Sequence, residues 1–82
     1  LSEYFKDNQR IQHIIGINKE WVGTYSLHEN VIKHESVNYD TLSKFVEAHY
    51  KKEQPNSSCK AQGWVECKYE VDGQWVEIKK NQ

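Results

Sequence analysis

The dipeptide Asp72-Gly73 constrains the fold of this chain more than any other feature, because it stands between two stretches of alternating apolar and polar residues. Both central residues of a type I′ turn need a positive φ, which Asp and Gly adopt readily, so a β-hairpin is predicted within residues 63–79. A two-residue turn also determines the register and places Tyr69 opposite Val76. In this register the apolar side chains share one face, and these are Val65, Cys67, Tyr69, Val71, Val76 and Ile78.

The other face of the predicted hairpin carries both C-terminal tryptophans. Exposed Trp is unusual on a monomer and common as an anchor in protein interfaces, so this face is a candidate interaction surface. In an alternative arrangement, N-terminal residues such as Phe5 fold over the rings and cover them. Around the tryptophans, glutamates lie opposite lysines and would set specificity. The predicted interaction surface consists of Trp64, Trp75, Glu66, Lys68, Glu70, Glu77 and Lys79.

Residues 41–52 are predicted to form a helix, because apolar and aromatic side chains recur there with the 3.6-residue period of an α-helix. Asp40 or Asn38 is the expected N-cap, since either side chain can accept hydrogen bonds from the first unpaired backbone N–H groups. Pro55 cannot continue the helix. The predicted buried stripe is Leu42, Phe45, Val46, His49 and Tyr50.

The N-terminal half of the chain shows strand patterns. Isoleucines and a histidine alternate with other residues over residues 11–17, which predicts a strand. Residues 21–27 and 31–37 predict two further strands, joined by a two-residue turn at Glu29-Asn30. This turn pairs Leu27 with Ile32 and Tyr25 with His34.

The first residues allow a second interpretation, in which Ser2 caps a helix over residues 2–15 that ends before Gly16. A short helical turn over residues 2–7, followed by a strand, combines both patterns. With that combination the element order is β-β-β-α-β-β. One amphipathic helix then packs on one face of an antiparallel sheet of about five strands, a two-layer α+β fold. Residues 1–82 are expected to form a single small α+β domain.

Composition and charge argue against several classes of function. The formal net charge is −1 and Arg10 is the only arginine, whereas nucleic-acid binders carry an excess of Lys and Arg on one face. No apolar run approaches the ~20 residues of a membrane-spanning helix. No signal segment is visible, which favours the cytoplasm, but the chain begins with Leu1 rather than Met, so removal of a preceding segment stays open.

Catalytic and metal-binding patterns are weak. The spacing of His28 and His34 differs from that of a zinc-binding helix, and the predicted turn sends the two rings to opposite faces, so no metal or other cofactor is expected. Cys59 and Cys67 are expected to be free thiols, with a disulfide as the alternative. A cysteine nucleophile would need His49, which belongs to the apolar stripe of the helix, so an enzyme is not expected.

The sequence therefore predicts a small soluble, non-enzymatic module that binds another protein or itself. A homodimer fits this prediction because a small antiparallel sheet leaves edge strands to pair. The alternative is a small-molecule-binding domain with a pocket between helix and sheet, where apolar walls meet a few polar groups. This pocket would be lined by Tyr25, His34, His49, Tyr50 and Tyr69.

Overall fold

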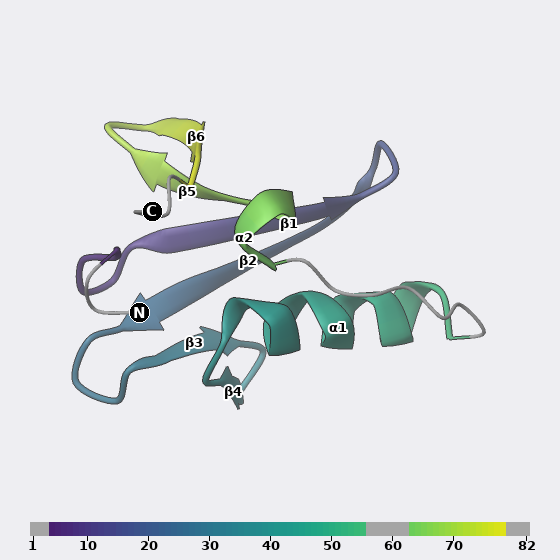
Figure 1. Cartoon of the computed structure of the whole chain (residues 1–82), viewed down its shortest axis with the longest axis horizontal. Coiled ribbons are helices and arrows are strands. Elements are labelled where there is room, and N and C mark those ends of the chain that lie inside the picture. Colours follow the sequence, from purple (N-terminus) through teal and green to yellow (C-terminus); the bar gives the residue numbers. More distant parts are fainter. Residues whose placement is uncertain (1–3, 56–62, 79–82) are drawn as a thin grey trace.

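The computed structural model describes residues 4–55 and 63–78, which form an antiparallel sheet of six strands and two helices (Figure 1). The elements are β1 (Arg10–Ile15), β2 (Lys19–Ser26), β3 (Val31–His34), β4 (Val37–Tyr39), α1 (Leu42–Glu53), α2 (Gly63–Glu66), β5 (Cys67–Val71) and β6 (Gln74–Glu77). The strands lie in the order β4-β3-β2-β1-β5-β6. The predicted two-layer α+β class is confirmed, with six strands in place of about five.

The hairpin of β5 and β6 has the predicted turn and the predicted register. Asp72 and Gly73 have φ angles of 51° and 80°, and Tyr69 pairs with Val76. The first strand of the hairpin nevertheless begins only after α2, because Gly63–Glu66 are helical. The predicted extension of this strand back to the start of α2 is therefore wrong.

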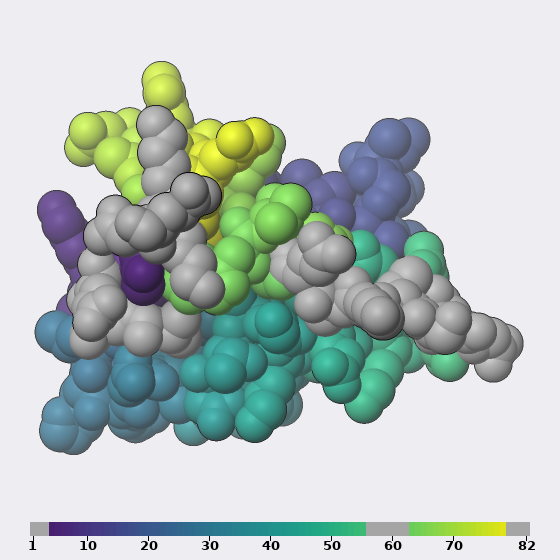
Figure 2. Space-filling view, in the orientation of Figure 1, coloured from purple at the N-terminus to yellow at the C-terminus, as the bar shows by residue number. Residues whose placement is uncertain are grey.

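Contacts with distant residues explain why α2 is helical. Gly63 lies so close to α1 that an added Cβ atom would be 2.5 Å from the backbone carbonyl carbon of Leu42, so glycine allows α2 to dock on α1. The atoms of the two helices lie side by side in Figure 2, α2 in green and α1 in teal. Docking also brings Glu66 to His13 of β1, with 3.1 Å between Oε1 and Nε2.

The loop between β2 and β3 is longer than predicted. It comprises residues 27–30, and Tyr25 pairs with Ile32 rather than with His34. The Tyr25 hydroxyl donates a hydrogen bond to Asn30 Oδ1 at 2.6 Å, and Asn30 has a φ of 54°, so the wider loop has its own stabilising contact. The register is displaced by an even number of residues, and each side chain therefore keeps its predicted face.

A tight turn divides the strand that was predicted over residues 31–37. Glu35 and Ser36 have φ angles of 48° and 67°, in the left-handed region that such residues rarely occupy. The turn folds the chain back, so that β4 pairs with β3 and Tyr39 lies opposite Ile32. The prediction of one strand is wrong because this dipeptide is not among those that favour two positive φ angles.

Helix α1 matches the predicted range within one residue at each end. Its N-cap is Thr41, whose hydroxyl accepts a hydrogen bond from the backbone N–H of Lys44 at 3.0 Å. The assignment of Asp40 or Asn38 as N-cap is therefore wrong. The buried residues of α1 are Leu42, Phe45, Val46 and His49, four of the five residues of the predicted stripe, whereas Tyr50 is half-buried.

The segment before β1 is not helical in the described residues, so the interpretation of residues 2–15 as a helix is wrong. The chain is extended over β1 because this strand pairs with β2 on one side and with β5 on the other. Within the described part of the chain, no helix has the length and apolar content needed to cross a membrane.

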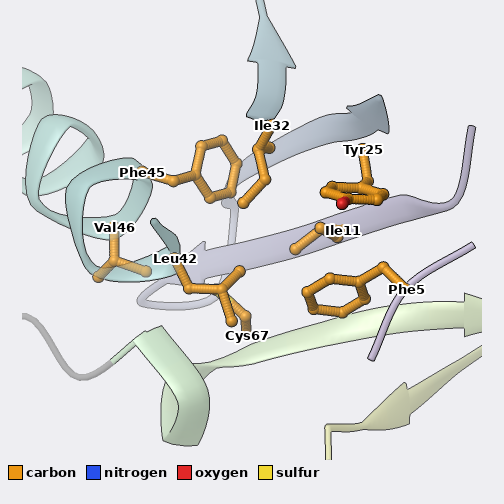
Figure 3. Packing of buried hydrophobic residues seen from close by; sticks show 8 residues of the cluster. All are labelled: Phe5, Ile11, Tyr25, Ile32, Leu42, Phe45, Val46 and Cys67. Carbon is orange, nitrogen blue, oxygen red and sulfur yellow. The ribbon is translucent and has the colours of Figure 1, made fainter. Parts of the chain in front are cut away.

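The core lies between α1 and the sheet (Figure 3). Phe5, from the segment before β1, is only 3% exposed and closes one end of it. Full burial of one large apolar side chain stabilises the fold by about 1.5–3 kcal/mol, so this cluster dominates stability. It consists of Phe5, Ile11, Tyr25, Ile32, Leu42, Phe45, Val46 and Cys67.

Candidate functional site

The face of the sheet that is turned away from α1 is the first candidate site, and we refer to it as the open face. In β1 the side chains of Ile11, His13 and Ile15 are buried under the helix layer, so the intervening side chains point to the opposite side, where Arg10 and Ile14 are exposed and Gln12 is only 7% exposed. Residues that pair across neighbouring strands point to the same face of the sheet, so the pairs of β1 with β2 and β5, and of β5 with β6, show which other side chains share this face. The open face is defined by Arg10, Gln12, Ile14, Glu20, Val22, Thr24, Lys68, Glu70, Trp75 and Glu77.

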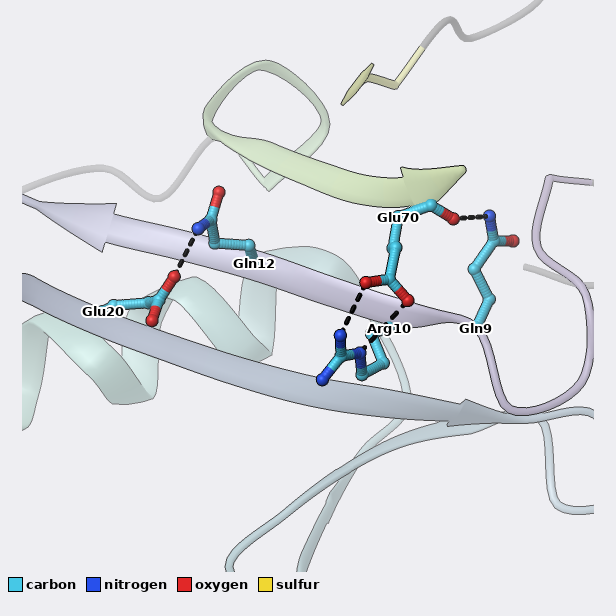
Figure 4. A network of polar contacts seen from close by, with 5 residues as sticks. All are labelled: Gln9, Arg10, Gln12, Glu20 and Glu70. Atoms are coloured by element: carbon cyan, nitrogen blue, oxygen red, sulfur yellow. Dashed lines mark hydrogen bonds and ion pairs between the residues drawn. The ribbon is translucent and has the colours of Figure 1, made fainter. Parts of the chain in front are cut away.

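Polar contacts organise the centre of the open face (Figure 4). Arg10 forms a bidentate ion pair with Glu70, with 3.2 Å from Nε to Oε1 and 2.5 Å from Nη2 to Oε2. These hydrogen bonds raise the pKa of Arg10 and lower the pKa of Glu70, so both groups are charged at neutral pH. The Arg10 guanidinium also lies 5.9 Å from the ring centroid of Trp75, a cation–π contact. Beside this pair, Gln12 donates a hydrogen bond to Glu20.

The structure brings four of the predicted interaction residues onto the open face, namely Lys68, Glu70, Trp75 and Glu77. Lys68 lies opposite Glu77 across β5 and β6. Sequence reasoning did not connect Arg10 with this surface, although the alternation along β1 was a signal for its outward position. Lys79 lies outside the described residues.

Trp64 and Glu66 do not belong to the open face, because both are part of α2. Trp64 stacks on Phe5, with 6.0 Å between ring centroids and an interplanar angle of 9°. Phe5 therefore covers this ring, in agreement with the alternative arrangement for the tryptophans. Glu66 lies against His13, on the helix side of the sheet. The predicted grouping of Trp64 and Glu66 with Trp75 is wrong.

The five residues predicted to line a pocket between helix and sheet lie in three different places. Tyr25 is fully buried in the core. His34, His49 and Tyr50 belong to a second cluster of rings, which adjoins the core through Phe45. An open cleft of about 480 Å³ lies between the segment before β1 and the β5–β6 turn, and Tyr69 is the one predicted pocket residue that borders it.

This second cluster is the second candidate site, and its polar part joins three elements. His13 of β1 and His49 of α1 are both 0% exposed, and their Nδ1 atoms are 2.8 Å apart. His13 Nε2 lies 3.1 Å from Glu66 Oε1 of α2, and the Tyr50 hydroxyl of α1 donates a hydrogen bond to the same oxygen. We refer to His49, His13, Glu66 and Tyr50 as the polar chain.

The ring of Trp21 packs against the polar chain. It stacks between His34 and His49, with ring centroids 4.1 Å and 4.5 Å away and interplanar angles of 26° and 13°. Lys52 Nζ lies 5.9 Å from the centroid of the same ring. Burial, followed by the nearby His13, His34 and Lys52, lowers the pKa of His49 to about 4, so this imidazole is neutral at pH 7.

Metal binding and thiol chemistry find little support in residues 4–55 and 63–78. In these ranges, no three or more His, Cys, Asp or Glu side chains are grouped so as to hold a metal ion. Cys67 is a buried free thiol, and burial raises its pKa to about 12, so it is not an activated nucleophile at neutral pH. Cys59 lies outside the described residues.

The chain matches no family model, no curated protein and no solved structure in the three comparisons made. Its function is therefore inferred from the two sites themselves. The charged and aromatic side chains at the centre of the open face are partly exposed to solvent, whereas the histidines of the polar chain are fully buried.

Proposed function

We propose that this protein is a small non-enzymatic module that binds another protein, or a second copy of itself, through the open face. The observation that carries the proposal is the bidentate pair of Arg10 and Glu70 beside Trp75. Trp and Arg are enriched among the residues that contribute most to protein binding. Because Glu70 already holds Arg10 in one orientation, less side-chain entropy is lost when a partner binds.

The remainder of the open face favours a protein partner. Ile14, further along β1, is 44% exposed and adds an apolar contact at the other end of the face. The carboxylates of the face outnumber its cations, which disfavours a phosphate backbone and suits a partner that carries both signs of charge. The charged residues of the face are Arg10, Lys68, Glu20, Glu70 and Glu77.

Exchange of Trp75 for alanine tests the proposal. Sedimentation velocity of the wild-type protein at several concentrations first shows whether a second copy is the partner. If sedimentation shows that the wild-type protein is monomeric, partners are captured from an extract of the source cells, and the Kd for each purified partner is measured by calorimetry. We expect Trp75→Ala to raise this Kd, or the Kd of self-association, at least about 30-fold, as for other anchor residues of interfaces.

Ile17→Ala is the matched control, because Ile17 is 98% exposed in the β1–β2 turn and lies outside the open face. Its Kd should equal that of the wild type. Lys68→Glu reverses an exposed charge of the open face and should weaken binding while the fold is retained. Circular dichroism and thermal unfolding check the fold of each variant. If Trp75→Ala unfolds the protein, or binds as well as Ile17→Ala, the proposal fails.

A further inference from the structure

The polar chain crosses the layer between the two helices and the sheet, and it ends at an unpaired atom. Its Nδ1–Nδ1 contact joins His49 to His13, and Nε2 of His13 continues it to Glu66. Both histidines are completely buried. Among the described residues, His49 Nε2 has no hydrogen-bond partner. Such buried, unpaired polar atoms are uncommon in folded proteins, so this one calls for a physical explanation.

The carboxylate of Glu66 determines where the protons of the chain lie, because an ionised carboxylate only accepts hydrogen bonds. His13 must therefore carry its proton on Nε2 and leave Nδ1 as an acceptor. His49 then donates from its own Nδ1, so its Nε2 is a lone pair that faces no donor in the described residues. An added proton binds at this nitrogen, since the other ring nitrogens of the chain are engaged.

A proton on His49 Nε2 creates a positive charge in surroundings that disfavour it. Burial opposes the charge most strongly, followed by His13 from β1, His34 from β3 and Lys52 from α1 itself, and together they lower the pKa of His49. The Trp21 face attracts a cation, but Lys52 already lies over the same ring.

The acidic groups near His49 are engaged elsewhere. Glu66 from α2 contacts His13 rather than His49. Glu35, from the β3–β4 turn, lies 3.9 Å from Lys52 Nζ and 3.7 Å from His34 Nε2. Cys67 from β5 stays a neutral thiol. A protonated His49 is therefore stabilised only when its ring reaches water.

We propose that the polar chain is an acid-sensitive latch, in which proton uptake at His49 releases α2 and the C-terminal half of α1 from β1. The N-terminal half of α1 stays docked, because Leu42, Phe45 and Val46 hold it through apolar contacts that do not titrate. This response is separate from the binding function proposed for the open face, and neither depends on the other.

The size of the effect follows from the difference between the folded and unfolded chains. The pKa of His49 is 6.5 without the fold and about 4 within it. Because folding lowers this pKa, the contribution of neutral His49 to the free energy of unfolding is fully present above pH 6.5 and is lost as the pH falls toward 4. Between pH 7 and pH 5, proton uptake at His49 should raise the unfolding constant about 20-fold.

The first test compares two histidine-to-asparagine variants by urea unfolding at pH 7 and pH 5. His49→Asn places an amide N–H near the former Nδ1 position, so it can keep the hydrogen bond to His13 without a titrating ring. His28→Asn is the control, because His28 is exposed in the loop after β2. When the pH is lowered from 7 to 5, the unfolding constants of the wild type and of His28→Asn should rise about 20-fold more than the unfolding constant of His49→Asn. An equal rise in all three proteins would overturn the proposal.

The second test uses the wild-type protein and is independent of whether His49→Asn folds. At pH 7, nitrogen-15 NMR should show the imidazole proton of His49 on Nδ1 and that of His13 on Nε2. From pH 7 to pH 5, amide exchange corrected for intrinsic rates should accelerate at least about tenfold in residues 47–53 relative to β1. A proton on His49 Nε2 at pH 7, or an equal loss of protection in α1 and β1, would exclude the latch.

Discussion

Replacement of Gly63 by alanine should destabilise the protein strongly, because it forces α2 away from α1. The added Cβ atom would lie 2.5 Å from the carbonyl carbon of Leu42, 2.6 Å from its Cβ and 2.7 Å from the amide nitrogen of Ser43. Ordinary van der Waals contacts are 3.4–4 Å. Since backbone atoms cannot rotate aside as a flexible side chain does, α2 must move outward by about 1 Å.

Two contributions set the magnitude of this change. Overpacking of a close contact costs about 1–3 kcal/mol. The displacement also pulls Glu66 from His13, and the loss of a hydrogen bond to a charged group adds about 1.5–3 kcal/mol. We therefore expect the free energy of unfolding to fall by about 3–5 kcal/mol, and Tm to fall by more than about 10 °C.

Urea unfolding at pH 7 measures the loss, with Gly16→Ala as the control. Gly16 has a φ of 66°, and an added Cβ there meets nothing within 4 Å. At Gly16 alanine is opposed only by the left-handed backbone conformation, which should lower the free energy of unfolding by about 1–2 kcal/mol. If residues 63–66 continued the hairpin strand instead, alanine would be tolerated or stabilising at Gly63. A loss for Gly63→Ala no larger than that for Gly16→Ala would refute the docking of α2 on α1.

Two further changes test individual side chains. Thr41→Ala removes the N-cap of α1 and should lower the free energy of unfolding by about 1 kcal/mol, whereas Asp40→Ala should change it by less than about 0.5 kcal/mol. Urea unfolding measures both changes. A larger loss for Asp40→Ala than for Thr41→Ala would contradict the assignment of Thr41 as the N-cap. Alkylation of Cys67 at pH 8, followed by peptide mass spectrometry, should be at least about 100-fold slower in the native protein than in urea, because burial raises the pKa of this thiol. Equal rates would show that the thiol is accessible.

The C-terminal hairpin was predictable because the information that determines it is local. Asp72 and Gly73 set the turn, and a two-residue turn determines each pair beyond it, including Glu70 with Trp75. Helix α1 was predictable for a similar reason, since its apolar period lies within one continuous segment. In both elements, neighbours in sequence decide the structure.

Helix α2 was not predictable, because its contacts lie far away in the sequence. The alternation around Cys67 favours a strand, yet Gly63 approaches Leu42 and Glu66 meets His13. No local pattern contains these pairs. The predicted positions of Trp64 and Glu66 were both wrong for one reason, because a change from strand to helix alters the direction of every side chain in the segment.

The candidate sites show the same limit. Periodicity placed His13 and His49 on inward faces, but neither pattern says how far a strand lies from a helix, so their 2.8 Å contact appears only in the folded chain. The pairing of Arg10 with Glu70 depends on β1 lying beside β5, although five elements come between these two strands in the chain. In β1 and α1, side-chain direction was thus predictable from the sequence, whereas the neighbours that each side chain meets were not.

Strand β1 connects the two sites, because its side chains alternate between them. Arg10 belongs to the open face, and His13 belongs to the polar chain on the other side of the same strand. Backbone pairing with β2 and β5 holds β1 in place from both sides. Release of α2 and the C-terminal half of α1 at acid pH would therefore uncover the part of β1 around His13 without separating the strands that keep Arg10 beside Glu70. Binding through the open face requires the register of the sheet, whereas the response to protons requires the docked helices, so one strand can serve both without either site disrupting the other.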